Sequence, residues 1–75
     1  MIGIQTVIAK LHSQGCHRRG DLDDQVSLYF EFPLGSVFSI PKPLENDQYN
    51  SEQLTEIQSQ VEFRGIDLLP LDPNH

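Results

Sequence analysis

One cluster of basic side chains in this sequence could act on a phosphodiester, and it consists of His17, Arg18 and Arg19. Guanidinium groups hold phosphate through paired hydrogen bonds, and an imidazole can give or take a proton near neutral pH. The acidic stretch 21–24 follows directly, and its carboxylates could pair with the arginines instead. The cluster therefore indicates either a nucleic-acid-binding site or a solvated loop with internal ion pairs.

A metal site is a second possibility, because His12, Cys16 and His17 lie close together along the chain. A closed zinc site needs four ligands, however, and the chain has no paired cysteines at a recognised spacing. The stretch 21–24 resembles the start of a calcium loop, but Phe32 stands where the bidentate glutamate belongs. No histidine is placed to activate a serine, and the single glycines form no phosphate loop. We therefore predict no metal, no cofactor and no catalytic residue.

Length and charge limit the possible partners. The 75 residues fit one small domain, and the net charge of −6 opposes binding to RNA phosphates, so RNA is a possible but disfavoured partner. The only cysteine, Cys16, excludes an internal disulfide and fits a reducing compartment. The N-terminal segment has the pattern of neither a signal peptide nor a membrane span. We expect a cytoplasmic protein that does not use a membrane.

A β-hairpin is predicted between Val26 and Pro41. Proline and glycine in the segment 33–35 are typical of a tight turn, residues 37–40 return as a second strand, and Pro41 ends it. The preceding segment 16–19 could be an edge strand or an irregular connection, which gives two or three strands. The apolar residues of the first strand recur at every second position and should face the core: Val26, Leu28, Phe30 and Phe32.

Two helices should cover this hairpin. The first, from about Ile4 to Gln14, ends where Gly15 can take a left-handed conformation and Cys16 can pack back on the helix. The second begins with Asn50 and Gln53 at the two positions of a capping box. It ends at a second glycine stop, Gly65 followed by Ile66. The apolar stripes of the two helices are Ile4, Val7, Ile8 and Leu11, and Leu54, Ile57 and Val61.

Candidate partner-binding residues lie outside this core. We divide the chain into a domain, residues 1–66, and an extended tail, residues 67–75. So small a domain should have little core left to receive the apolar side chains of the tail, and Tyr29 and Val37 should lie on the sheet face away from the helices. We expect a protein partner or a second copy, most simply in a twofold dimer, at these residues: Tyr29, Val37, Leu68, Leu69 and Leu71.

Three segments resemble the HicA toxins of bacterial HicA–HicB toxin–antitoxin pairs. They are VIAKLHSQGC, SVFSIP and SEQLTEIQSQVEFRGI, and they resemble the family's first helix, its strand ending in Val-Pro and its second helix. The resemblance implies a double-stranded-RNA-binding-like fold and RNA cleavage. The family's catalytic Gly-Ser-His stretch falls near Asp23, Asp24 and Gln25, none of which is a histidine.

The sequence therefore predicts an α+β domain of helix, two or three antiparallel strands and helix, with both helices on one face of the sheet. The first functional hypothesis is a non-catalytic partner-binding module, a degenerate HicA-like toxin–antitoxin component. The alternatives are an RNA-cleaving toxin that uses His17, and a structural subunit of a larger assembly. Growth arrest on expression would indicate the toxin.

Overall fold

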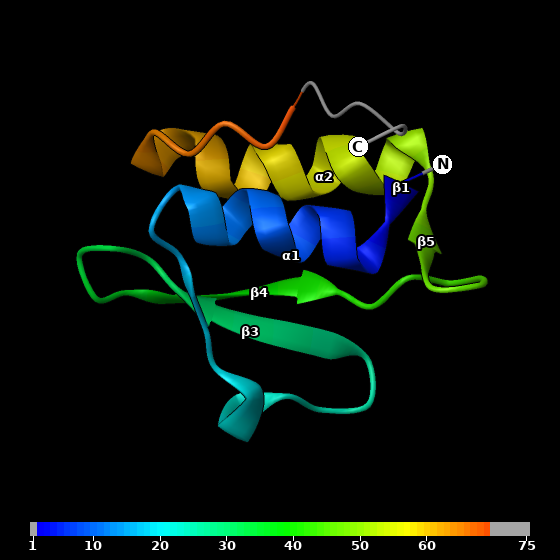
Figure 1. The fold of residues 1–75 in the computed structure, drawn as a ribbon, viewed down its shortest axis with the longest axis horizontal. Helices are drawn as coiled ribbons and strands as arrows, with labels where there is room; N and C mark the ends of the chain where they lie inside the picture. Colours follow the sequence, from blue (N-terminus) through cyan, green and yellow to red (C-terminus); the bar gives the residue numbers. More distant parts are fainter. Residues whose placement is uncertain (1, 70–75) are drawn as a thin grey trace.

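The computed structural model describes residues 2–69 (Figure 1). It confirms the α+β class, with two helices, an antiparallel sheet in the order β2-β3-β4 and a separate pair of short strands, β1 and β5. Within the described range, neither helix has the length and apolar character needed to cross a bilayer. In chain order the elements are β1 (Ile2–Gly3), α1 (Ile4–Ser13), β2 (His17–Arg18), the 3-10 turn η1 (Gly20–Leu22), β3 (Ser27–Glu31), β4 (Val37–Pro41), β5 (Gln48–Tyr49), α2 (Ser51–Val61) and the 3-10 turn η2 (Glu62–Arg64).

The predicted hairpin is formed by β3 and β4, and Phe30 pairs with Phe38 across it. In its turn, the Gly35 N–H donates to the Phe32 carbonyl at 2.9 Å, and Gly35 has a φ of +100°, where glycine is favoured. Leu28, Phe30, Phe32 and Ile40 are buried, as the alternation predicts.

The prediction that Val26 faces the core is wrong. Its side chain is 69% exposed, and it lines an open hollow with Leu44 and Gln53. The apolar alternation extends to Val26, one residue before the start of β3, where the side chain is no longer buried. The period-2 pattern therefore located the strand but extended beyond its buried part.

The first helix ends as the sequence predicts. Gly15 has a φ of +89°, and the Cys16 N–H donates to the Leu11 carbonyl at 3.1 Å, which is the closing bond of a Schellman stop. Cys16 is buried. The chain then enters β2, where His17 pairs with Glu31 and Arg18 with Phe30, so the ambiguous segment 16–19 contributes a two-residue edge strand.

The second helix also follows its signals. The Asn50 carboxamide oxygen accepts from the Gln53 N–H at 2.8 Å, and the Gln53 side chain accepts from the Asn50 N–H at 3.2 Å. Beyond the helix and η2, Gly65 has a φ of +78° and the Ile66 N–H donates to the Val61 carbonyl at 3.4 Å. Loss of an N-cap such as Asn50 typically costs about 1 kcal/mol.

The strands β1 and β5 were not predicted, because each is only two residues long and shows no periodicity in the sequence. Asn46 and Asp47 both have positive φ, at 52° and 56°, and the Gln48 N–H donates to the Glu45 carbonyl at 2.9 Å. This is the geometry of a tight hairpin turn that asparagine and aspartate tolerate. The turn also begins α1, since the Asp47 carbonyl accepts from the Ile4 N–H at 2.8 Å.

The expectation that little core is left to receive the tail is wrong at Leu68. Its side chain is 0% exposed, and Leu69 packs against the same cluster. The Gln58 side chain accepts from the N–H groups of both residues, at 2.7 and 2.9 Å. At the end of α1, the Gln14 side chain accepts from the Asp67 N–H at 2.7 Å and donates to its carbonyl. Two glutamines thus bind the tail backbone to both helices, while Leu71 lies outside the described residues.

Candidate functional site

The first arginine of the basic cluster is held by an internal carboxylate. Arg18 forms a two-pronged pair with Asp23, in which Nη1 donates to Oδ1 at 2.7 Å and Nη2 to Oδ2. The Asp23 Oδ1 atom also accepts from the Tyr29 N–H at 2.9 Å. The hydrogen bond from Arg18, together with that N–H, lowers the pKa of Asp23 to about 2. Arg18 therefore closes an internal network rather than presenting a free cation.

Arg19 is held in the same way by two acids. Its Nε and Nη2 atoms donate to Asp21 at 3.2 and 3.1 Å, and its Nη1 atom donates to Glu31 at 3.4 Å. The hydrogen bond with Arg19 lowers the pKa of Asp21. The ion pairs expected as the alternative to phosphate binding are therefore present at both arginines.

The carboxylates of Asp23 and Asp24 both bind backbone N–H groups at the start of β3. The Asp24 Oδ1 atom accepts from the N–H groups of Val26 and Ser27 at 2.9 and 2.8 Å. Together with the bond from Asp23 to Tyr29, this satisfies backbone donors where the sheet begins. These carboxylates hold the chain, and their charge opposes an RNA phosphate at the same place.

His17 lies exposed on β2, and its ring centroid is 6.5 Å from that of His12 in an edge-to-face arrangement. Burial raises the pKa of the Cys16 thiol, which disfavours the thiolate that a metal requires. Residues 2–69 contain no group of three histidine, cysteine or acidic side chains that could hold a metal ion. The structure thus brings the two histidines near each other without forming a metal site in this part of the chain.

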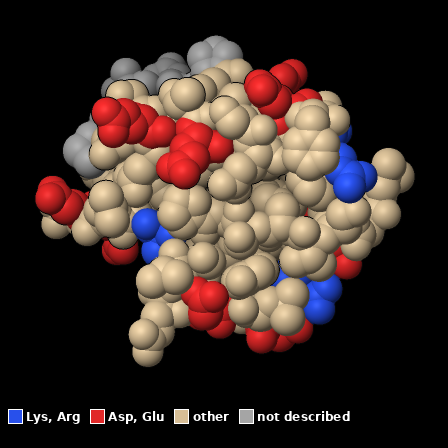
Figure 2. All heavy atoms as spheres, turned by 180° about the vertical axis from the view of Figure 1, so that it is seen from behind, with Lys and Arg blue, Asp and Glu red and all other residues tan. Residues whose placement is uncertain are grey.

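The expected partner-binding residues of the sheet are accessible. Val37 is exposed and Tyr29 is partly exposed, and the Tyr29 hydroxyl lies 3.5 Å from the Asp24 carboxylate. Their role in binding stays a prediction. Figure 2 shows one face of the molecule, where Lys and Arg atoms occur in small separate groups, while acidic atoms occur at many places.

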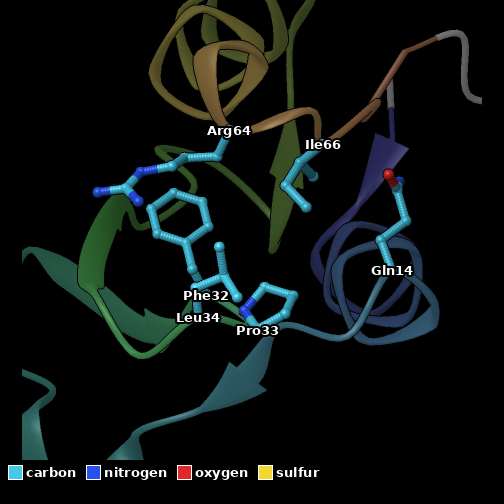
Figure 3. A pocket seen from close by; sticks show the side chains of 6 residues that line it. All are labelled: Gln14, Phe32, Pro33, Leu34, Arg64 and Ile66. Carbon is cyan, nitrogen blue, oxygen red and sulfur yellow. The ribbon is translucent and has the colours of Figure 1, made fainter.

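An apolar hollow, which sequence reasoning missed, lies where the hairpin turn meets the ends of α1 and η2 (Figure 3). Its volume is about 310 Å³. We call it the turn hollow and define it by its lining residues: Gln14, Phe32, Pro33, Leu34, Arg64 and Ile66.

The walls of the turn hollow are fixed from three sides. The Gln14 side chain is hydrogen-bonded to the Asp67 backbone. Gly15 approaches the hairpin so closely that an added Cβ would lie 3.0 Å from Pro33 Cγ. On the remaining side, an Arg64 Nη2 atom donates to the Ser36 hydroxyl at 3.1 Å. A site whose walls are already positioned loses little freedom when it binds.

Arg64 gives the turn hollow its charge. Its guanidinium carbon lies 5.3 Å from the ring centroids of both Phe32 and Phe63, so the cation lies over two aromatic faces. Unlike Arg18 and Arg19, it has no carboxylate within ion-pairing distance among residues 2–69. The guanidinium therefore keeps donors that a ligand's oxygen atoms could use.

Two large apolar side chains stand exposed beside the turn hollow. Leu34 is 89% exposed at the tip of the hairpin, and Phe63 is 70% exposed in η2, with its ring 6.2 Å from that of Phe32. Single exposed apolar residues are ordinary, but here two of them flank an apolar hollow next to a cation. The arrangement can hold an apolar side chain and an acidic group together.

The sequence carried a faint signal of this site. Phe63 falls after the apolar stripe of α2 ends, so its aromatic ring has no place on the buried face. Position 34 is the tip of a tight turn, where polar residues are usual, and it holds a leucine. Their proximity could not be deduced, because it depends on how the end of η2 meets the hairpin.

Comparisons with protein-family models, curated proteins and solved structures find no match for this chain.

Proposed function

We propose that this chain is a small protein-binding module that receives an apolar side chain of its partner in the turn hollow. The observation that carries the proposal is Arg64, a cation without an acidic partner among residues 2–69 that lies over Phe32 and Phe63 at the edge of an apolar hollow. Protein interfaces concentrate their energy in such places, where an aromatic or arginine anchor borders a pocket.

The size of the turn hollow favours a side chain over a cofactor. Sites for small molecules usually enclose about 300–1,000 Å³ and bury most of the ligand. The turn hollow, at about 310 Å³, lies at the lower end of that range and is open at the rim formed by Leu34. One leucine, methionine or phenylalanine of a partner is a fitting occupant.

The partner's chemistry follows from the lining. An apolar anchor would contact Phe32, Pro33 and Ile66, and an adjacent carboxylate would meet the Arg64 guanidinium. The charge of −6 on this chain repels acidic partners over most of its surface, which makes the position of the acid near Arg64 specific. We therefore infer a partner segment in which an aspartate or glutamate neighbours a large apolar residue.

The HicA-like reading belongs to the same proposal. The burial of hairpin residues with those of both helices in one cluster, including Phe30, Leu11 and Ile57, supports an arrangement with both helices on one face of the sheet. In that setting the chain would be a toxin–antitoxin component that binds protein. The ribonuclease alternative gains no support from Arg18 and Arg19, because internal acids engage both.

A random peptide library panned on the immobilised chain tests the proposal. We expect enriched peptides to share a large apolar residue next to an acid. In NMR titrations they should shift the amides of Leu34, Arg64 and Ile66. The substitutions Leu34→Ser and Arg64→Ala should each weaken binding at least tenfold.

The matched control is Leu44→Ser, because Leu44 is also highly exposed but lines a different hollow beside Val26 and Lys42. Binding should survive this change. Loss of binding in Leu44→Ser with retention in Leu34→Ser would move the site to that second hollow. A library that yields no specific peptide would overturn the proposal.

A further inference from the structure

The outer edge of β4 presents backbone groups that the sheet leaves unused. In an antiparallel pair, alternate residues bond across the ladder and the others point away. The bonds from the Phe32 N–H to the Ser36 carbonyl and from the Lys42 N–H to the Val26 carbonyl fix this alternation in the hairpin. It follows that Val37 and Ser39 direct their N–H and C=O groups away from β3.

The same alternation is visible on the other side of β3, which checks the assignment. Tyr29 pairs with Ser39 in the register, and its own backbone groups point toward β2. There its carbonyl accepts from the Arg19 N–H at 2.8 Å and its N–H donates to Asp23. On both strands, the backbone N–H and C=O groups of the odd-numbered residues thus point away from the β3–β4 ladder.

Within residues 2–69, no hydrogen bond is formed by the backbone groups of Val37 and Ser39 on this edge. The edge ends at Pro41, which has no N–H and whose carbonyl accepts from the Tyr49 hydroxyl at 2.7 Å. The unused part of the edge therefore consists of two N–H donors and two carbonyl acceptors.

The two edges of the sheet differ in their protection. β2 is two residues long and carries His17 and Arg18, the latter tied to Asp23. Short length and charge are the usual means of preventing an edge from pairing. β4 has five residues, Val37–Pro41, and none is charged. Only its last residue, the proline, limits pairing.

We propose that a second copy of this chain pairs with β4 in antiparallel fashion, about a twofold axis at Phe38. In this register Val37 exchanges two hydrogen bonds with the partner's Ser39, and Ser39 does the same with the partner's Val37. All four unused groups are then satisfied, and the two sheets join into one six-stranded sheet.

The side chains on this edge favour a second copy over a foreign strand. A twofold axis at Phe38 places the two Phe38 side chains opposite each other. In each copy, the Phe38 ring stacks on those of Phe32 and Phe30, with ring centroids 4.2 and 5.6 Å apart. Val37 lies beside the partner's Ser39 on the other face. Because the strand is uncharged, two acidic chains can meet here without placing like charges directly opposite each other.

Hydrogen exchange of individual amides tests the pairing, together with sedimentation equilibrium over a roughly hundredfold dilution series. In a monomer, the Phe38 and Ile40 amides are protected by the ladder and those of Val37 and Ser39 are not. We expect protection of Val37 and Ser39 to rise with concentration, in step with the dimer fraction. Protection of Phe38 and Ile40 should hold throughout and shows that the fold is intact.

The substitution Val37→Lys puts a charge on the edge and should abolish the dimer and the protection of Ser39. Val26→Lys is the matched control, because Val26 is exposed but lies outside β4, and it should leave both unchanged. A chain that stays monomeric with Val37 and Ser39 unprotected overturns the proposal. So does a dimer without this protection, or protection that only a foreign peptide produces. Failure here leaves the turn hollow untouched, because Leu34→Ser and Arg64→Ala do not alter the edge.

Discussion

Two arginines of this molecule lie over phenylalanines of the same hairpin, and they differ in their partners. The Arg18 guanidinium carbon is 5.4 Å from the centre of the Phe30 ring, and that of Arg64 is 5.3 Å from the centre of the Phe32 ring. Arg18 is bound by the Asp23 carboxylate, whereas the hydrogen-bond partner of the Arg64 guanidinium among the described residues is the Ser36 hydroxyl. The aromatic contact is therefore common to both, and the carboxylate distinguishes them.

The difference separates a structural cation from an available one. Asp23 joins Arg18 to the Tyr29 backbone, so the pair holds β2 and the segment after η1 against β3. Arg64 stands where the hairpin turn, α1 and η2 leave an apolar hollow. The sequence offered two roles for Arg18 and Arg19, phosphate binding or internal ion pairs, and it gave no binding role to Arg64, which stands alone. Clustering of like charges is a weak guide to binding when acids lie within a few residues.

The largest expected effect on stability is at Phe30, whose ring lies beneath Arg18. Phe30→Ala removes a ring that is fully buried between Arg18 and the core, and changes of this type cost about 3–5 kcal/mol. A domain of this size has little more stability than that, so we expect the variant to be largely unfolded at room temperature. Circular dichroism with a urea titration measures it.

The matched aromatic residue beside Arg64 is Phe63. Its ring is exposed, so Phe63→Ala should change the free energy of unfolding by less than about 1 kcal/mol. If Phe30→Ala and Phe63→Ala melted within a few degrees of each other, the contrast between a structural Arg18 and an available Arg64 would be lost.

Local signals in the sequence located most of the elements. The glycine stops at Gly15 and Gly65 and the capping box at Asn50 depend on residues within one turn of each other, and the structure confirms them. The two-residue strands β1 and β5 carry no periodicity, and their pairing joins residues 2–3 to residues 48–49. Leu68 likewise depends on a distant residue, Gln58, which fixes the tail backbone in the core.

The site was harder to predict than the fold, for the same reason. Phe32, Arg64 and Gln14 come from three separate parts of the chain, and only tertiary packing brings them to one hollow. The sequence did suggest the ion pairs of Arg18 and Arg19, because their acids lie nearby in the chain. Partner-binding roles for Tyr29 and Val37 stay predictions, since exposure alone does not show what binds.

The next prediction uses pH to weaken the Arg18–Asp23 pair alone. An aspartate titrates near pKa 3.9 in an unfolded chain, and the pKa of Asp23 is lowered to about 2 in the folded one. Because the folded state holds this proton less tightly, the pair stabilises the fold fully above pH 4. That contribution is lost as the pH falls through about 2.

We therefore expect Asp23→Asn to melt below the parent at pH 7 and the gap between them to narrow as the pH falls from 4 to 2. Thermal unfolding monitored at each pH provides the measurement. When Arg18 is replaced by alanine, the same Asp23 substitution should show a shallower pH dependence. A gap that stayed constant from pH 7 to pH 2 would mean that the Arg18–Asp23 pair contributes nothing specific to the fold.

An effect on stability as small as that of Phe63→Ala is expected at Arg64. An exposed cation over an aromatic ring contributes about 0.5–1 kcal/mol, and the Ser36 hydroxyl can bond to water when Arg64 is absent. Arg64→Ala should therefore lower the free energy of unfolding by about 1 kcal/mol at most. Arg18→Ala should cost clearly more in the same urea titration, because it also leaves Asp23 without its partner. A binding residue can be removed at little cost to the fold, whereas a structural one cannot. Equal losses in the two variants would show that Arg64 supports the fold as Arg18 does, and would remove the main argument for a binding site at the turn hollow.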